Sequence, residues 1–89
     1  MIDPGQIKAA RGLLSLSQAD LAKKASVHVA TIRRIEATAE IRGAAETLWK
    51  IQTALEQAGV EFIAGDESKG PGVRLKRSDK GKSARRTRR

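Results

Sequence analysis

The sequence predicts a mostly α-helical domain of four to five short helices, followed by a short C-terminal β-hairpin and a disordered basic tail. Three observations predict this fold class. Apolar residues recur at helical spacing through the first part of the chain, with capping residues between the periodic segments. After Gly59 the pattern changes to short alternating segments, "GVEFI" (59–63) and "GVRL" (72–75). From residue 76 onward the residues are almost all basic or small and polar.

The 89 residues suffice for one domain with a modest core, and no cysteine is present to form a disulfide or a thiolate metal site. We expect a helical domain over 1–59, a hairpin over 60–75 and a tail over 76–89. The first residues lack the layout of a signal peptide, and no apolar run approaches the ~20 residues of a membrane span. We therefore expect a cytoplasmic protein with no cofactor, no metal and no membrane contact.

The positive charge is concentrated at the C-terminus. The formal net charge is +8, and residues 76–89 hold eight Lys or Arg against one Asp. A run of this kind is typical of a solvated arm that binds polyanions. We prefer a nucleic-acid clamp; a solubilising end and contact with a membrane or protein surface are the alternatives. One Phe, one Trp and no Tyr argue against a base-stacking surface for single strands.

Capping signals place the first two helices. The first should run from Pro4 to Leu14, with Asp3 as its cap and Pro4 at the first helical position. Its apolar residues at helical spacing are Ile7, Ala10, Leu13 and Leu14. The second should open at "SQAD", where Ser17 and Asp20 have the spacing of a capping box.

Periodicity places the other two helices. The third should span about His28 to Glu36, with Ile32 and Ile35 directed inward. Residues 37–43 are expected to form a loop. The fourth should cover roughly Ala44 to Ala58, and Gly59 supplies a left-handed stop.

The second and third helices, separated by a short turn, form the pattern "SQADLAKKA-SVH-VATIRRIE", which predicts a helix-turn-helix. Ala22 lets the two helices cross closely, while Val27 and Ile32 fill the crossing. On a helical wheel Val29 lies at the boundary of the inner face. The outward residues of the third helix form the strip that would meet a DNA major groove, namely Ala30, Arg33, Arg34 and Ala37.

Residues 7–58 resemble the DNA-binding domain of phage repressor and Cro proteins, the XRE-type regulators. The stretches that carry the resemblance are "LSQADLAKKASV" and "TIRRIEA", and "AGVEFI…GPGVRL" is similar to the ending of short bacterial members. The resemblance implies a repressor-like helix-turn-helix fold. It also implies a sequence-specific, double-stranded DNA-binding transcriptional regulator of the bacterial nucleoid, most simply a repressor. No phosphate-cradling loop, metal cluster or catalytic triad is recognisable in the sequence, so we do not expect an enzyme.

The resemblance also implies residue roles. Base contacts would come from Val29, Ala30, Arg33 and Arg34, and phosphate contacts from Gln18, Lys23, His28, Thr31 and Arg42. Gln18 would also brace the reading helix. Arg11 and Glu36 match a pair that ties the first helix to the reading helix. Relatives often have Gly at the positions of Ser15 and Ser26, and Ser or Thr at that of His28.

Each of these roles has a plainer alternative. Arg33 and Arg34 could form a solvated face, and Lys23 could be ordinary surface charge. His28, the only histidine, has no recognisable partners for metal binding or catalysis. Trp49 could cover the edge of the core or belong to a subunit contact.

We expect a homodimer on two half-sites. Its possible contact residues are Trp49, Val60, Phe62, Val73 and Leu75.

Two further functions remain as alternatives. The same domain could serve as a protein-interaction module, such as an antitoxin, an anti-activator or an adaptor, that binds a protein partner through the hairpin. The tail alone could bind nucleic acid without sequence preference.

If the chain reads DNA, we expect thymine opposite Val29 and Ala30, because apolar side chains pack on its methyl group. Guanine is expected near Arg33 and Arg34.

Overall fold

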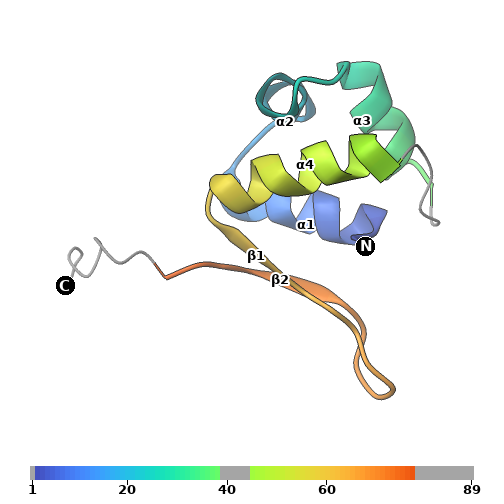
Figure 1. The fold of residues 1–89 in the computed structure, drawn as a ribbon, viewed down its shortest axis with the longest axis vertical. Helices are drawn as coiled ribbons and strands as arrows, with labels where there is room; N and C mark the ends of the chain where they lie inside the picture. Colours follow the sequence, from blue (N-terminus) through green and yellow to red (C-terminus); the bar gives the residue numbers. More distant parts are fainter. Residues whose placement is uncertain (1, 39–44, 78–89) are drawn as a thin grey trace.

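The computed structural model of the chain describes residues 2–38 and 45–77, in which four helices form a body and a two-stranded hairpin extends from it (Figure 1). The predicted mostly helical fold with a C-terminal hairpin is confirmed. The expected loop falls largely outside these residues, as do Arg42 and the tail beyond Arg77. No helix in the described part of the chain is long and apolar enough to span a bilayer. The elements are α1 (Pro4–Leu14), α2 (Gln18–Ala25), α3 (Val29–Glu36), α4 (Ala45–Gln57), β1 (Val60–Ile63) and β2 (Gly72–Leu75).

The core lies where the inner faces of the four helices meet. In Figure 1, α4 passes in front of α1, and α2 and α3 lie above both. Burying each large aliphatic side chain contributes roughly 1.5–3 kcal/mol. Leu13 differs from the other periodic residues of α1, since 43% of it is exposed. The side chains that are completely covered are Ile7, Leu21, Ile32, Ile35, Ile51, Leu55 and Val60.

The expected helix starts at α1 and α2 are confirmed by side-chain hydrogen bonds. Asp3 Oδ1 accepts from the Gln6 amide at 2.8 Å, and Gln6 Oε1 accepts from the Asp3 amide at 2.9 Å. Ser17 and Asp20 form the same reciprocal pair at 2.9 and 3.0 Å. At α3 the cap residue is His28, whose side chain makes no capping hydrogen bond. α3 therefore has the least supported start of these three helices.

Two serines end helices in the left-handed conformation. Ser15 closes α1 with φ 58° and Ser26 closes α2 with φ 59°. A side chain is strained there, and glycine is not. We predict that Ser15→Gly and Ser26→Gly each raise the free energy of unfolding by about 0.5–1 kcal/mol, measured by urea denaturation. Ser17→Gly is the matched control and should lower it, because Ser17 has extended backbone and its hydroxyl caps α2.

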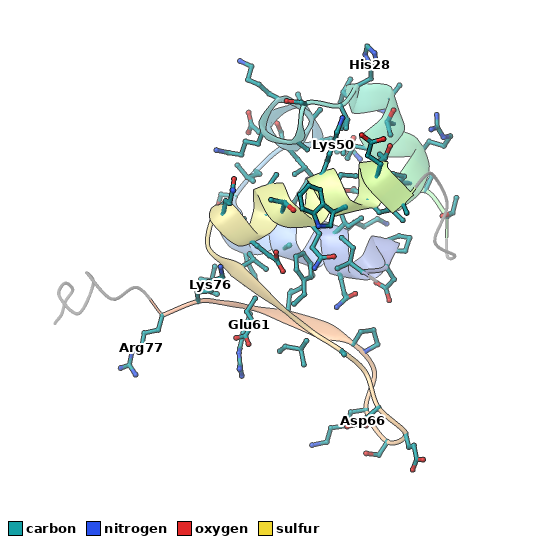
Figure 2. All side chains as sticks on the ribbon, viewed as in Figure 1. His28, Lys50, Glu61, Asp66, Lys76 and Arg77 are labelled. Atoms are coloured by element: carbon teal, nitrogen blue, oxygen red, sulfur yellow. The ribbon has the colours of Figure 1, made fainter. Side chains whose placement is uncertain are left out.

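The hairpin presents one face to the helices and the other to solvent. Its strands are antiparallel, with Phe62 opposite Val73 and Glu61 opposite Arg74. Phe62 and Val73 pack against the core from the inner face. On the outer face, Arg74 Nε donates to Glu61 Oε1 at 2.7 Å. Asp66 closes the tip by accepting from nearby backbone amides (Figure 2).

Gln6 fastens the hairpin to α1. Its side chain is only 6% exposed. Nε2 donates to the Ile63 carbonyl at 3.2 Å and to the Gly72 carbonyl at 2.9 Å. Ile63 and Gly72 face each other in the ladder. The amide therefore uses both of its protons to hold both strands, while its oxygen caps α1.

We predict that Gln6→Glu releases the hairpin from α1. A carboxylate can still accept from Asp3 but cannot donate to the two strand carbonyls, which leaves two partly buried acceptors without this donor. The expected cost is about 2–3 kcal/mol of unfolding free energy, with faster amide exchange in both strands. Gln57→Glu, on the exposed end of α4, is the matched control. Unchanged exchange in the strands of the Gln6 variant would contradict this role.

Candidate nucleic-acid interface

The turn between α2 and α3 sets the angle of the two helices. Ser26 reverses the chain in the left-handed conformation, and the Val27 amide donates to the Ala22 carbonyl at 3.0 Å. Ala22 is buried between the helices, and Val27 packs on the core beside it. Ile32 is completely buried. The small and branched residues predicted for this crossing therefore belong to the core or pack against it, and α3 is held with one face outward.

The outward face of α3 forms what we call the reading strip, made of Ala30, Arg33, Arg34 and Ala37. All four residues are exposed. The strip spans two turns of a helix that lies at the edge of the body in Figure 1. Neither arginine forms an ion pair with a residue that the structure describes. Two uncommitted guanidinium groups on a rigid helix can donate hydrogen bonds to base edges or phosphates.

The start of α3 is less open than the strip. Val29 and Thr31 are half-buried, and Val29 packs against the core. His28 stands exposed at the outer end of the helix (Figure 2). Ala30 is thus the more accessible of the two apolar residues expected to meet bases.

A buried ion pair links α1 to the base of α3. Arg11 donates to both Glu36 carboxylate oxygens at 2.7 Å, and its third nitrogen donates to the Leu16 carbonyl at 3.0 Å. The Glu36 side chain is 3% exposed and that of Arg11 is 19% exposed. Gln18 Nε2 also donates to Glu36, at 3.1 Å. One carboxylate therefore ties α1, α2 and α3 together.

The titration of this pair follows from its contacts. Burial would by itself raise the pKa of Glu36, but the hydrogen bonds from Arg11 and Gln18 outweigh it, so the pKa lies below its ordinary 4.5. The hydrogen bond to Glu36 raises the pKa of Arg11 above its ordinary value. Both groups are charged at neutral pH, which holds the α1–α3 junction in one geometry.

The remaining expected contact residues lie in different settings. Lys23 is exposed on α2. Trp49 is 65% exposed and Leu75 is 52% exposed, whereas Phe62 and Val73 are half-buried. Val60 is completely buried, so it is a core residue and cannot meet a partner while the fold persists. In the part of the chain that the structure describes, no group of three or more potential ligands could hold a metal ion.

The two crossed helices with an exposed reading face define a helix-turn-helix protein. A family model described as Helix-turn-helix matches residues 7–58. The matched segment includes α2, α3 and the turn between them, and it covers more than half of the chain. The chain therefore belongs to the XRE-type helix-turn-helix family and is a DNA-binding regulator of that class. A search of curated proteins found no match.

Proposed function

We propose that the protein binds double-stranded DNA at specific sequences by placing α3 in the major groove, and that it represses transcription by occupying those sites. The observation that supports this proposal most directly is the reading strip. Its two arginines are exposed and form no ion pair with a described residue. The opposite face of the helix is buried, and Glu36 links it to Arg11. A reading element must be rigid, since ordering it on binding would cost affinity.

Phosphate contacts would fix the register of the helix on DNA. Gln18 lies at the start of α2 and gives one amide proton to Glu36, so a second proton remains for a phosphate. Lys23, His28 and Thr31 flank the same surface and are expected to approach the backbone. The first turn of α2 adds helix-end amides, which favour an anion. Arg42, expected in the same role, stays a prediction.

Base contacts would divide between apolar and charged side chains. Ala30 and the exposed part of Val29 are expected to pack on thymine methyl groups. Arg33 and Arg34, a turn further along, are expected to donate to guanine O6 and N7. A half-site would allow both kinds of contact if its thymine and guanine were separated by about the length of one turn of α3.

Selection of bound sequences from random DNA tests this proposal. The expected result is an enriched motif that carries thymine and guanine and occurs as two half-sites related by symmetry, because we propose that the protein binds as a homodimer. No enrichment over unselected DNA would contradict sequence-specific reading. Enrichment of a single, unpaired half-site would keep the reading mode and contradict the dimer.

The basic tail is proposed to add sequence-independent affinity. Residues 78–89 hold six Lys or Arg and one Asp. Deletion should begin after Arg77, since Lys76 closes the hairpin through its amide on Gly59 at 2.7 Å and its ammonium on the Glu56 carbonyl at 2.9 Å. We predict that the truncated chain binds every DNA sequence more weakly than the full-length chain does. The slope of log affinity against log salt should fall by ~0.9 for each phosphate that the tail neutralises.

Two comparisons show what causes any effect of the truncation on DNA binding. A full-length variant with the six basic residues of 78–89 replaced by glutamine should match the deletion, which separates charge from length. An unchanged salt slope in both would show that the tail does not track DNA. Loss of all DNA binding on truncation, together with no sequence preference in the full-length chain, would instead favour binding through the tail alone.

A second candidate function is binding of a protein partner through the hairpin, as in an antitoxin, an anti-activator or an adaptor. The observation in its favour is the two-stranded sheet itself, whose ladder contains only β1 and β2 among the described residues, with Leu75 largely exposed at its base. Strand edges of this kind accept a further strand. Biological activity that survives loss of DNA binding would favour this function over the first.

A further inference from the structure

We propose that the outer face of α4 is the surface through which two copies of this chain associate, with the helices antiparallel and a two-fold axis level with residues 47 and 48. The proposal deepens the proposed function, because it rests on two copies reading two half-sites. It assigns their contact to α4 and not to the hairpin. The occupant of the face is therefore a second copy of the chain.

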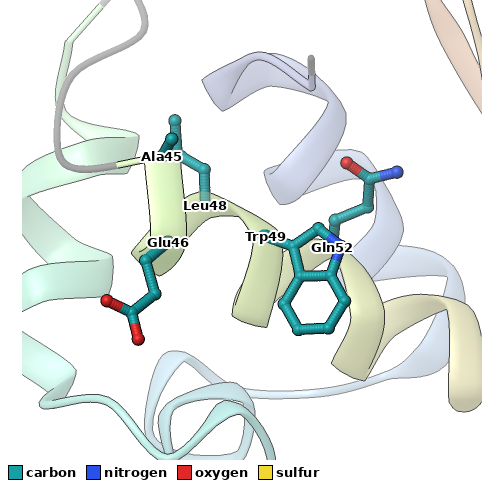
Figure 3. A pocket seen from close by; sticks show the side chains of 5 residues that line it. All are labelled: Ala45, Glu46, Leu48, Trp49 and Gln52. Atoms are coloured by element: carbon teal, nitrogen blue, oxygen red, sulfur yellow. The ribbon is translucent and has the colours of Figure 1, made fainter.

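The first observation is an indole that is largely uncovered by the residues the structure describes. Trp49 is 65% exposed, although Leu48 and Ile51 beside it are buried in the core. It projects from α4 next to a hollow of about 600 Å³, lined by Ala45, Glu46, Leu48 and Gln52 as well as by Trp49 itself (Figure 3). A large apolar side chain and a hollow stand side by side on one helix, and the indole does not fill the hollow.

The second observation is that the face is complementary to itself in size. A two-fold contact must match a surface with its own copy. Antiparallel helices that cross at residues 47 and 48 bring the start of one helix beside the middle of the other. The indole of each copy then meets the small Ala45 and the hollow next to it. One large and one small residue a turn apart provide the knob and the hole that such packing needs.

The third observation is that the face is complementary to itself in charge. Glu46 and Lys50 lie four residues apart on α4, a spacing that allows an ion pair within the helix. No such pair forms, and neither charge pairs with any other described residue. In the antiparallel arrangement, Glu46 of one copy lies opposite Lys50 of the other, twice by symmetry. Charges that have no partner among the described residues of one chain would then be paired between two chains.

The face leaves the reading strip uncovered. Figure 2 shows Lys50 over α4 on the side toward the viewer, while His28 marks the outer end of α3. A second copy on α4 therefore need not block α3. A contact about one helix long predicts a weak dimer in solution, which two half-sites on one DNA would strengthen by holding both copies together.

The full-length chain reports on this contact directly, because Trp49 is its single tryptophan and it has no tyrosine. Sedimentation velocity and tryptophan emission should be followed over the same concentration series. The expected result is a monomer–dimer equilibrium in which the emission moves to shorter wavelength as dimer forms. Dimer formation with unchanged emission would overturn the proposal, since the indole would then have stayed in water.

Charge reversal tests the pairing. Glu46→Lys alone and Lys50→Glu alone should each raise the dimer dissociation constant by on the order of tenfold or more, because like charges then face each other. The double variant should return it to within about threefold of the wild-type value, as restored pairing predicts. Glu67→Lys, the same change on the exposed hairpin tip, is the matched control and should have no effect.

The remaining outcomes separate this inference from the proposed function. If Leu75→Asp disrupts the dimer and the α4 variants do not, the hairpin is the interface: the assignment to α4 falls and the homodimer stands. If the double variant fails to recover, Glu46 and Lys50 do not face each other, and the proposal is overturned. If the chain stays monomeric even on DNA with two half-sites, both the α4 contact and the proposed homodimer are contradicted. Sequence-specific binding by that monomer would still support the proposal that α3 reads DNA.

Discussion

Glu36→Gln should lower the free energy of unfolding at neutral pH by about 3–5 kcal/mol, because it leaves the Arg11 guanidinium at the edge of the core without its counter-ion. The side chain keeps its size, so the loss reports on charge and not on packing. It also weakens the acceptor that Gln18 uses, at 3.1 Å in the wild type. Urea denaturation at fixed pH measures the effect. The same substitution at Glu61, in the exposed pair with Arg74, is the control and should change stability little.

The pH dependence has a definite sign. The pKa of Glu36 is depressed in the folded chain below its ordinary 4.5. Its contribution is therefore fully present above the unfolded pKa and is lost as the pH falls from about 4.5 through the depressed folded value. Wild type should destabilise more steeply than Glu36→Gln in this range, so that the gap between them narrows with acid. A gap that stays constant as the pH falls would show that the carboxylate charge is not what stabilises the junction.

Local signals in the sequence account for most of the helical body. Asp3, Pro4 and Ser17 specify where α1 and α2 begin through contacts within one turn, and the structure places both starts where they were expected. Helix ends that depend on neighbouring residues can be predicted from a short window. Leu13 shows the limit of periodicity, because an apolar residue at the right spacing can still fall on the exposed side of the helix.

The attachment of the hairpin could not be predicted in the same way. Gln6 is polar and lies in the first turn of a helix, where a side chain ordinarily meets solvent. Its partners on the strands are 57 and 66 residues away, so no local pattern signals them. Val60 was expected at a subunit contact because alternation alone does not tell which face of a short strand is covered. Its complete burial follows from packing of β1 on the helices.

Some features of the candidate DNA-binding surface could be predicted from the sequence in more detail than others. The helical wheel placed Arg33 and Arg34 outward, and the structure confirms their exposure. The Arg11–Glu36 pair was implied by the family resemblance, and its geometry is now explicit. The resemblance also implied that Gln18 braces the third helix, and its hydrogen bond to Glu36 at 3.1 Å provides that support. The left-handed backbone at Ser15 and Ser26 fits the glycines that relatives often have there.

Arg33→Ala and Arg34→Ala should each weaken binding to the selected DNA site by roughly 10- to 100-fold, corresponding to about 1–3 kcal/mol for a lost bidentate contact to guanine. The double variant should bind the selected site little better than unrelated DNA. Both residues are exposed, so the fold should be unaffected, as circular dichroism and urea denaturation would verify. The affinities are to be measured at one fixed salt concentration, because salt alone changes them strongly.

The pattern of the loss distinguishes reading from general attraction. If an arginine contacts a guanine, its removal weakens the selected site more than a site mutated at that base, and the preference for that base disappears. Lys23→Ala is the comparison, since a phosphate contact should weaken all DNA about equally and reduce the salt slope by about one. Equal losses on selected and scrambled DNA for both arginines would assign them to the backbone. No loss at all would make the strip a solvated face, and the reading of DNA would then depend on residues other than these two.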